Sequence, residues 1–252
     1  MTAPVFVVDP GRLDALSTGD TFRLDGAEGR HAGVVQRRSR GERLDVVDTR
    51  GVRLVGLVAD VSPQGVDVEV LELVREPSPP VRLVLVQALA KGDRDELAIE
   101  AATEVGADAV VPWQADRSIV VWRGERAAKS RARWLGTVRT AAKQSRRAWV
   151  PDVELAVDSK ALAARAAEVV AAGGAVLVLH ETATDPVTEA ELPQGGDVLV
   201  VVGPEGGISD DELARLVDAG ARPVRLGPHV LRTSTAGPVA LALLATRLGR
   251  WG

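Results

Sequence analysis

The sequence predicts an α/β domain preceded by a smaller all-β domain, which is either a barrel or a sandwich. Over the first 75 residues, short β-branched or alternating segments recur between glycine-containing turns, a pattern typical of small barrels and sandwiches. From Val81 onward, apolar strand patterns alternate with helical patterns, which predicts a mainly parallel sheet covered by helices. Between the two, Glu76–Pro80 holds three prolines and is expected to be a stiff linker. We therefore expect domains at residues 1–75 and 81–252, joined by residues 76–80.

Five strands are expected in the first domain. Each is rich in β-branched residues or alternates apolar with polar side chains, and each is bounded by a glycine or by the Pro63–Gly65 turn. The expected strands are Val5–Val8, Thr21–Leu24, Arg43–Val47, Val52–Val61 and Val66–Val74.

In the second domain, each expected element has its own signal. Val81–Leu89 is almost continuously apolar, as buried parallel strands are, and Asp93–Val105 has helical spacing that Gly106 closes. The helix expected over Ser209–Ala219 begins with a serine and a glutamate in capping-box spacing. The other expected strands are Ala109–Pro112, Ala175–Leu179, Asp197–Val202 and Pro223–Leu226, and the other expected helices are Glu125–Gln144, Lys160–Ala172 and Gly237–Leu248.

Composition excludes several classes of protein and of site. The 252 residues are 46% hydrophobic and 26% charged, the balance of an ordinary globular protein rather than a disordered one. No apolar run approaches the roughly 20 residues of a membrane span, and the first residues lack a signal-peptide pattern, so a cytoplasmic protein is expected. The chain has no cysteine and three widely separated histidines, so disulfides, thiolate nucleophiles and a metal site are not expected.

Basic residues concentrate in one stretch, although the net charge of the chain is −4. The window Arg117–Arg147 holds ten basic residues against Glu125 alone, and a weaker basic stretch runs from Arg30 to Arg53. Such a distribution is typical of a polyphosphate partner, although a solvated helix face gives the same pattern. Four of the five tryptophans lie in or beside the window, where they either stack on unpaired bases or belong to the core. The residues expected to contact nucleic acid are Arg30, Arg37, Arg38, Arg117, Arg131, Arg133, Arg139 and Arg147.

Candidate binding loops follow three of the expected strands, at the sheet edge where parallel α/β sheets bind ligands. Leu179–Glu181 ends one strand, Gly203–Gly207 the next, and Leu226–Ala236 the last. Gly206 and Gly207 are expected to adopt positive φ and to let a ligand approach the backbone. The chain contains neither GxGxxG nor GxxxxGK[ST], so a dinucleotide-binding loop and a P-loop are not supported. Taken alone, the glycine-rich segment is also typical of a tight strand-to-helix turn.

Together, the three loops resemble those of the SPOUT class of RNA methyltransferases and, more narrowly, of the bacterial 16S ribosomal RNA (uracil-N3)-methyltransferase family, the RsmE type. The resemblance extends over almost the whole chain, and the Gly203–Gly207 and Leu231–Thr233 motifs are specific for this family. At Ser234 the chain departs from the glutamate that many members carry. The narrower resemblance also rests on Arg30-His31, Lys91-Gly92-Asp93, Thr103-Glu104-Val105-Gly106, Asp116-Arg117-Ser118, and Ala142-Lys143-Gln144-Ser145 with Arg147 and Pro151.

The resemblance implies an α/β fold with a small β-barrel: an N-terminal PUA-like barrel that binds RNA, and a C-terminal SPOUT domain tied in a deep trefoil knot. It also implies a homodimer that binds S-adenosylmethionine in the knot loops and methylates N3 of a uridine in 16S rRNA, uridine 1498 in the usual rRNA numbering, on the assembled small subunit. The cofactor-binding residues that it implies are Leu179, His180, Gly203, Glu205, Gly206, Gly207, Leu226, Gly227, Val230, Leu231 and Thr233.

The chemistry of such a transfer selects two candidate catalytic residues. A sulfonium methyl group is already activated, so its transfer to a base nitrogen needs mainly alignment and exclusion of water. The proton on uridine N3 must leave, and Arg232 is the first candidate to stabilise the developing negative charge. Arg147 is the second candidate, or else a phosphate contact, and no general base is identified. Two alternatives stay open: an RNA methyltransferase of the same class with a different target nucleotide, and a non-catalytic assembly factor that binds rRNA.

Overall fold

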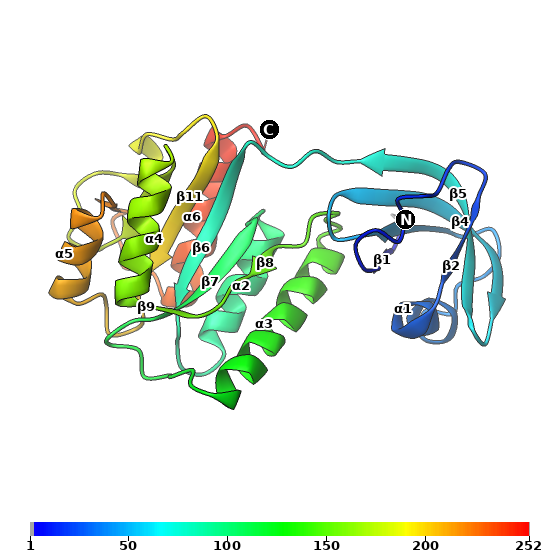
Figure 1. Cartoon of the computed structure of the whole chain (residues 1–252), viewed down its shortest axis with the longest axis horizontal. Coiled ribbons are helices and arrows are strands. Elements are labelled where there is room, and N and C mark those ends of the chain that lie inside the picture. The colour runs from blue at the N-terminus through cyan, green and yellow to red at the C-terminus, as the bar shows by residue number, and fades with distance from the viewer. Residues whose placement is uncertain (1–2, 252) are drawn as a thin grey trace. The chain divides into compact units, whose positions relative to one another are not determined.

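The structure, a computed structural model, describes residues 3–251 and divides into two compact units (Figure 1). The first unit comprises the chain up to Ser78 together with Ala142–Val150. The second comprises Pro79–Ala141 and the chain from Pro151 onward. The chain therefore returns to the first unit after its long basic helix, and nothing in the composition of residues 142–150 indicated this return.

The first unit is built on one five-stranded sheet, whose strand order is β1-β3-β4-β5-β2. β1 and β3 are parallel, and the other neighbouring strands are antiparallel. One face of the sheet buries side chains such as Phe6, Leu24, Leu44 and Leu54 in an apolar core. The elements are β1 (Val5–Val7), β2 (Thr21–Leu24), α1 (Gly26–Arg30), a π-helix η1 (His31–Val35), β3 (Arg43–Val47), β4 (Val52–Ser62) and β5 (Gly65–Arg75). All five predicted strands are confirmed to within a residue at either end, whereas α1 and η1 were not predicted.

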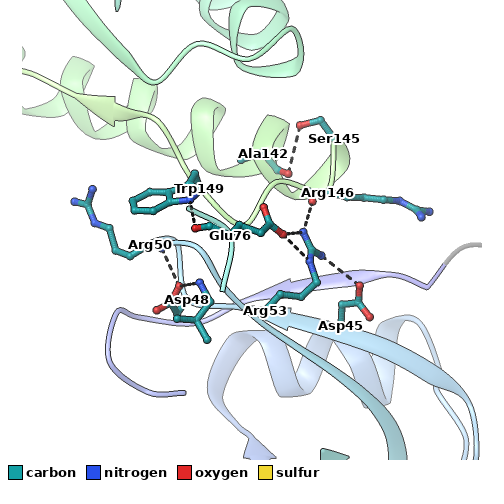
Figure 2. A network of polar contacts seen from close by, with 10 residues as sticks. Asp45, Asp48, Arg50, Arg53, Glu76, Ala142, Ser145, Arg146 and Trp149 are labelled. Atoms are coloured by element: carbon teal, nitrogen blue, oxygen red, sulfur yellow. Dashed lines mark hydrogen bonds and ion pairs between the residues drawn. The ribbon is translucent and has the colours of Figure 1, made fainter. Parts of the chain in front are cut away.

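Polar contacts tie the returning residues 142–150 to this sheet (Figure 2). The guanidinium of Arg53 donates to Oε1 of Glu76 at 2.8 and 2.9 Å, to Oδ2 of Asp45 at 3.2 Å, and to the carbonyl oxygen of Arg146 at 2.8 Å. The indole Nε1 of Trp149 donates to the carbonyl oxygen of Glu76 at 3.0 Å. The Arg53 side chain is only 15% exposed. This arginine of the second basic stretch therefore has internal partners and stabilises the fold.

The second unit is built on a seven-stranded parallel sheet of order β12-β10-β11-β6-β7-β8, with β9 also paired to β7. Two helices, α4 and α6, cover opposite faces of this sheet (Figure 1). The elements are β6 (Val81–Ala88), α2 (Arg94–Glu104), β7 (Ala109–Gln114), α3 (Glu125–Gln144), β8 (Asp152–Val153), β9 (Val157–Asp158), α4 (Ser159–Ala171), β10 (Ala175–Leu179), a 3₁₀ helix η2 (Val187–Glu189), β11 (Gly196–Val202), α5 (Asp210–Asp218), β12 (Arg222–Val224) and α6 (Thr233–Arg247). The last residues of α3 belong to the first unit.

The predicted α/β alternation is confirmed, and the pleat of the strands explains it. Val84 and Leu199 face the core cluster that contains Leu162 of α4. On the opposite face, Leu85 and Val202 lie against Gly237 of α6, where an added Cβ would come within 2.7 Å of Leu85. Because both faces are covered, β6 and β11 are apolar almost throughout.

The last helix begins four residues earlier than predicted, at Thr233 instead of Gly237. The polar run Thr233–Thr235 lacks the apolar periodicity of a buried helix, so the sequence pattern placed it in the preceding loop. In the structure, Thr233 Oγ1 donates to the carbonyl oxygen of Gly203 at 2.8 Å, which anchors the first turn of α6 on the end of β11. A tertiary contact therefore determines where this helix starts.

Three of the four tryptophans in or beside the basic window belong to the core. Trp113 and Trp134 are fully buried and Trp122 is 8% exposed, so the alternative of base stacking on these three rings is wrong. Trp122 and Trp134 meet edge to face with ring centroids 5.1 Å apart. Among the described residues, no helix is long and apolar enough to cross a membrane.

We expect Arg53→Ala to lower the free energy of unfolding by about 2 kcal/mol, because it leaves Glu76, Asp45 and the Arg146 carbonyl without their largely buried donor. Urea unfolding measures this loss. Arg75→Ala is the matched control: its ion pair with Asp14 spans 4.0 Å between exposed side chains, and its loss costs under about 0.5 kcal/mol. Equal stability of the two variants would contradict a structural role for Arg53.

Candidate functional site

One cavity of about 660 Å³ lies in the second unit, where the loops after β10, β11 and β12 meet. These strands run parallel, and β12 and β11 both neighbour β10, so their carboxyl ends lie together at one edge of the sheet. The three predicted binding loops therefore line a common space. The volume falls within the ~300–1,000 Å³ typical of sites for small molecules and cofactors.

Every residue predicted to bind the cofactor lines this cavity, and so do the first catalytic candidate Arg232 and the predicted RNA contact Arg117. Arg147 is not among the lining residues and belongs to the first unit. The predicted loops contribute five further lining residues that were not named as cofactor contacts: Glu181, Pro204, Pro228, His229 and Ala236. Four lining residues lie outside the predicted loops: Arg94, Val202, Ile208 and Arg225.

The glycines of the Gly203–Gly207 loop are required for different reasons. Gly207 has a φ of +76°, which agrees with the prediction. Gly206 does not have positive φ, so that prediction is wrong; its restriction is space, because an added Cβ would lie 3.1 Å from the Cβ of Arg117. At Gly203 an added Cβ would come within 2.7 Å of Ile208 Cγ1.

Glu205 projects from the same loop and pairs with the start of α2. Its Oε1 lies 2.8 Å from Nη1 of Arg94 and accepts from the Lys91 amide at 3.3 Å. Burial raises the pKa of Glu205, but hydrogen bonds from its own amide, from Arg94 and from the Lys91 amide outweigh this and leave the pKa below its usual value. Glu205 is therefore a carboxylate at neutral pH, and it joins this loop to the segment after β6.

Buried hydrogen bonds position Arg232 at the cavity. Arg232 is the N-cap of α6 and exposed, and Thr233, which follows it, is buried. Thr233 Oγ1 accepts from Nε2 of the fully buried Gln87 at 2.9 Å and donates to the Gly203 carbonyl. The backbone of Arg232 is thus fixed, while its guanidinium remains at the cavity surface.

The loop after β10 is also fixed through its backbone. The amide of His180 donates to the carbonyl oxygen of Val224 at 3.0 Å, which continues the pairing of β10 with β12. The His180 ring places Nδ1 2.9 Å from Oγ1 of Thr182. This contact orients the imidazole within its own loop.

Glu212 has a structural role at the site that sequence reasoning missed. The predicted capping box with Ser209 forms, but the Glu212 carboxylate is 1% exposed and has partners beyond its own helix. It accepts from the Asp116 amide at 2.8 Å and from Ser159 Oγ at 2.5 Å. Burial raises the pKa of Glu212, but the donors Ser159, Ser209 and Asp116 outweigh burial and leave it below its usual value. The capping-box spacing was the one signal of this residue in the sequence.

The arginines predicted to contact RNA differ in their environments. Nη2 of Arg131 donates to the carbonyl oxygen of Val153 at 2.6 Å, and its Nε lies 3.1 Å from the carbonyl oxygen of Glu154. Arg133 pairs with Glu96, and Arg38 pairs with Glu42 at 3.4 Å. Arg30, Arg37, Arg117 and Arg139 are exposed or partly exposed, and Arg147 is half-buried. The RNA contacts of all eight arginines stay predictions.

A metal centre finds no support in the part of the chain that the structure describes. No group of three or more histidine, aspartate and glutamate side chains lies close enough together there to hold a metal ion.

The chain is similar to known proteins over its whole length. A family model described as an RNA methyltransferase domain matches residues 77–245. A protein named ribosomal RNA small subunit methyltransferase E from Mycobacterium bovis is 48% identical over 253 residues, covering 100% of this chain and 94% of that protein. A protein of the same name from Bacillus subtilis is 32% identical, covering 89% and 90%.

Solved structures of methyltransferases are also similar to this chain. A crystal structure of a ribosomal RNA small subunit methyltransferase E from Neisseria gonorrhoeae bound to S-adenosyl methionine has a TM-score of 0.84 at 28% identity, covering 98% of each chain. A putative methyltransferase from Legionella pneumophila, in complex with the bound cofactor SAM, has a TM-score of 0.80 at 26% identity and covers 98% of each chain. The chain therefore belongs to the RNA methyltransferase domain family and, within it, to the family of ribosomal RNA small subunit methyltransferase E.

Proposed function

We propose that this protein is an S-adenosylmethionine-dependent rRNA methyltransferase that methylates N3 of a uridine in 16S rRNA, uridine 1498 in the usual numbering, on the assembled small subunit. The observation that carries the proposal is the cavity at the ends of β10, β11 and β12, which in a member of this family brings all eleven predicted cofactor residues together. Substrate and cofactor class follow from the family, and the target nucleotide follows from the resemblance in the motifs.

The residues at the cavity fit S-adenosylmethionine. Leu179, Leu226 and Leu231 offer apolar surface for an adenine ring, and glycines let a ligand approach the backbone amides and carbonyls. Glu205 and Glu181 are the acidic side chains of the lining, and they suit the positive charges of a sulfonium and an amino group. The related Neisseria and Legionella structures hold this cofactor.

The chain itself has to align the uridine and stabilise the charge that develops on it. S-adenosylmethionine supplies an activated methyl group when it is bound. Arg232 lies at the cavity surface with its backbone fixed through Thr233 and Gln87, so its guanidinium can meet the uracil oxygens as N3 loses its proton to solvent. Arg147, which belongs to the first unit, is proposed as a phosphate contact of the RNA.

The finer architecture implied by the resemblance is part of the proposal. The chain after β12 runs beside the β10–β11 connection: the Arg225 amide donates to Asp185 at 2.7 Å, and the Val187 amide donates to Arg225 at 2.9 Å. It then reaches Gly203 through Thr233, a path between two earlier loops that supports the trefoil knot. A homodimer is the oligomeric state that the resemblance implies. A PUA-like first unit and a cytoplasmic location accord with an rRNA substrate.

A methyl-transfer assay tests the function as a whole. Purified protein, labelled S-adenosylmethionine and small subunits from cells that lack the protein should give 3-methyluridine as the methylated nucleoside, identified by mass spectrometry. A different methylated nucleoside would support another target within the class. Binding to small subunits without any transfer would support the assembly factor.

We expect Gly207→Val to weaken S-adenosylmethionine binding at least about tenfold, because a β-branched residue at φ +76° is strained and the loop must move. Isothermal titration calorimetry measures the dissociation constant. Gly173→Val is the matched control, since Gly173 has a φ of +81° with nothing within 4 Å and does not line the cavity. It should lose stability and keep its affinity. Unchanged affinity in a folded Gly207→Val protein would exclude this loop from the site.

We expect Arg232→Ala to lower turnover about a hundredfold on small subunits, with the S-adenosylmethionine dissociation constant changed less than about threefold, because it removes one donor to a developing oxyanion. Single-turnover methyl transfer measures the rate. Arg232→Lys should recover part of the loss, since it keeps the charge without the planar fork. Near-normal turnover of Arg232→Ala would remove this residue from the mechanism.

The basic helix α3 should contribute phosphate contacts through its exposed side chains. Arg126 and Lys129 are exposed, so replacing both by alanine should flatten the slope of log affinity for rRNA against log salt by about 1.4 to 1.8. Lys160→Ala with Arg215→Ala removes the same charge from α4 and α5 and should leave the slope unchanged. Equal slopes for the two double variants would mean that this face of α3 does not meet RNA.

A further inference from the structure

A buried carboxylate outside the cavity, that of Glu212, collects donors from three separate parts of the second unit. Oε1 accepts from the amide of Asp116, after β7, and from Oγ of Ser159, at the start of α4. Oε2 accepts from the amide and the hydroxyl of Ser209, each at 3.0 Å. Ser159 in turn accepts from Nε1 of the fully buried Trp113 at 3.2 Å. A cap for α5 would need only the Ser209 contacts, so the other two donors indicate a further role.

The Asp116 end of this network leads directly to the cavity. Arg117 follows Asp116, and its Nη1 donates to the carbonyl oxygen of Gly206 at 3.0 Å. Its side chain also packs against the Gly206 backbone, since a Cβ at Gly206 would lie 3.1 Å from Arg117 Cβ and 3.6 Å from its Cδ. Arg117 and Gly206 both line the cavity. The Gly206–Gly207 turn is therefore supported on one side by Arg117, and Glu212 determines where the backbone before Arg117 lies.

We propose that Glu212 is a positioning residue for the cofactor loop: by holding the Asp116 amide, it fixes Arg117, which holds the Gly206 carbonyl and keeps the loop in its binding shape. The inference rests on the proposed function, because its main readout is the affinity for S-adenosylmethionine. The Ser209 hydroxyl lies 3.0 Å from Oε2 of Glu212 and 3.2 Å from Oδ2 of Asp116, and its single proton can be donated to only one of these oxygens at a time. The carboxylate suits this role because it can accept all four hydrogen bonds at once.

Neutral replacements cannot reproduce this arrangement. A carboxamide at position 212 has one acceptor oxygen, so either the Asp116 amide or the Ser209 amide faces an NH₂ group and loses its acceptor. An alanine removes every acceptor. The variants Glu212→Gln and Glu212→Ala therefore form a graded series that acts on the loop without touching the ligand.

The experiment measures the S-adenosylmethionine dissociation constant by calorimetry for the full chain carrying Glu212→Ala, Glu212→Gln, Arg117→Ala and the double variant Glu212→Ala/Arg117→Ala. We expect Glu212→Ala to bind at least about tenfold more weakly, with Glu212→Gln between it and the parent. The double variant should bind no more weakly than the poorer single variant, because both act through one contact. Arg117 is exposed, so Arg117→Ala keeps the fold if Glu212→Ala does not.

Glu154→Ala is the matched control for the loss of a partly buried carboxylate. Glu154 forms a bidentate ion pair with Arg165 and does not line the cavity. The Glu154→Ala variant should have a lower free energy of unfolding, and its dissociation constant for S-adenosylmethionine should stay within about twofold of that of the parent. A purely structural Glu212 would behave in the same way, so equal affinities of the folded Glu212 variants and the control would overturn the proposal. Multiplicative effects of Glu212→Ala and Arg117→Ala would overturn it as well.

Amide hydrogen exchange of residues 203–207 gives a readout that needs no cofactor. Faster exchange of this loop in Glu212→Ala and Arg117→Ala, with no change in Glu154→Ala, is the expected result. Unchanged exchange in a folded Glu212→Ala protein would overturn the positioning role. If the parent chain binds no S-adenosylmethionine while the exchange pattern follows expectation, the proposed function fails and the positioning role stands.

Discussion

The Glu212 carboxylate accepts four hydrogen bonds. The arrangement of the loops at the carboxyl ends of the strands of the seven-stranded sheet depends on these contacts. Glu212 lies in the first turn of α5, yet it binds the segment after β7 and the start of α4. A buried charge is costly unless its lone pairs are satisfied, and here the donors outweigh burial and lower the pKa. At a buried position without donors from three neighbouring segments, the same charge would lower the stability of the fold. Its position therefore specifies how these segments meet.

A second set of buried polar contacts also holds the glycine-rich loop. Gln87, at the end of β6, donates to Thr233, and Thr233 donates to the carbonyl oxygen of Gly203. These two hydrogen bonds connect the ends of β6 and β11 with the start of α6. The hydrogen bonds of Thr233 restrict the position of the preceding residue, Arg232, far more than apolar packing alone would. The catalytic role proposed for Arg232 needs this restriction, because a displacement of about 1 Å is enough to lose much of the rate advantage.

Positive charge in this protein divides into two populations that the sequence does not distinguish. Arg53 and Arg131 have their guanidinium groups against backbone carbonyls and, for Arg53, two carboxylates, so they stabilise the fold. Arg126 and Lys129 are exposed on α3 and can meet a polyanion. Charge counted along the chain therefore overstates the surface available to RNA. The buried tryptophans show the same division, since an aromatic residue beside cations in the sequence lies in the core in the structure.

The sequence by itself determined all the strands except the two-residue strands β8 and β9, most of the helices and the three loops that line the cavity. Each follows from local causes: β-branched runs, helical spacing, capping residues and glycines at strand ends. Only the tertiary structure decided that residues 142–150 return to the first unit, that α6 begins at Thr233 and that Gly206 is restricted by the side chain of Arg117 rather than by φ. It alone also brings the Glu212 carboxylate to the amide of Asp116, the residue before Arg117. These features depend on partners far apart in the chain. Asp116 and Glu212 are 96 residues apart, Arg117 and Gly206 are 89 residues apart, and Thr233 and Gly203 are 30 residues apart. Local periodicity carries no record of such partners, because it reports which face of an element is apolar and not which distant group will complete its hydrogen bonds.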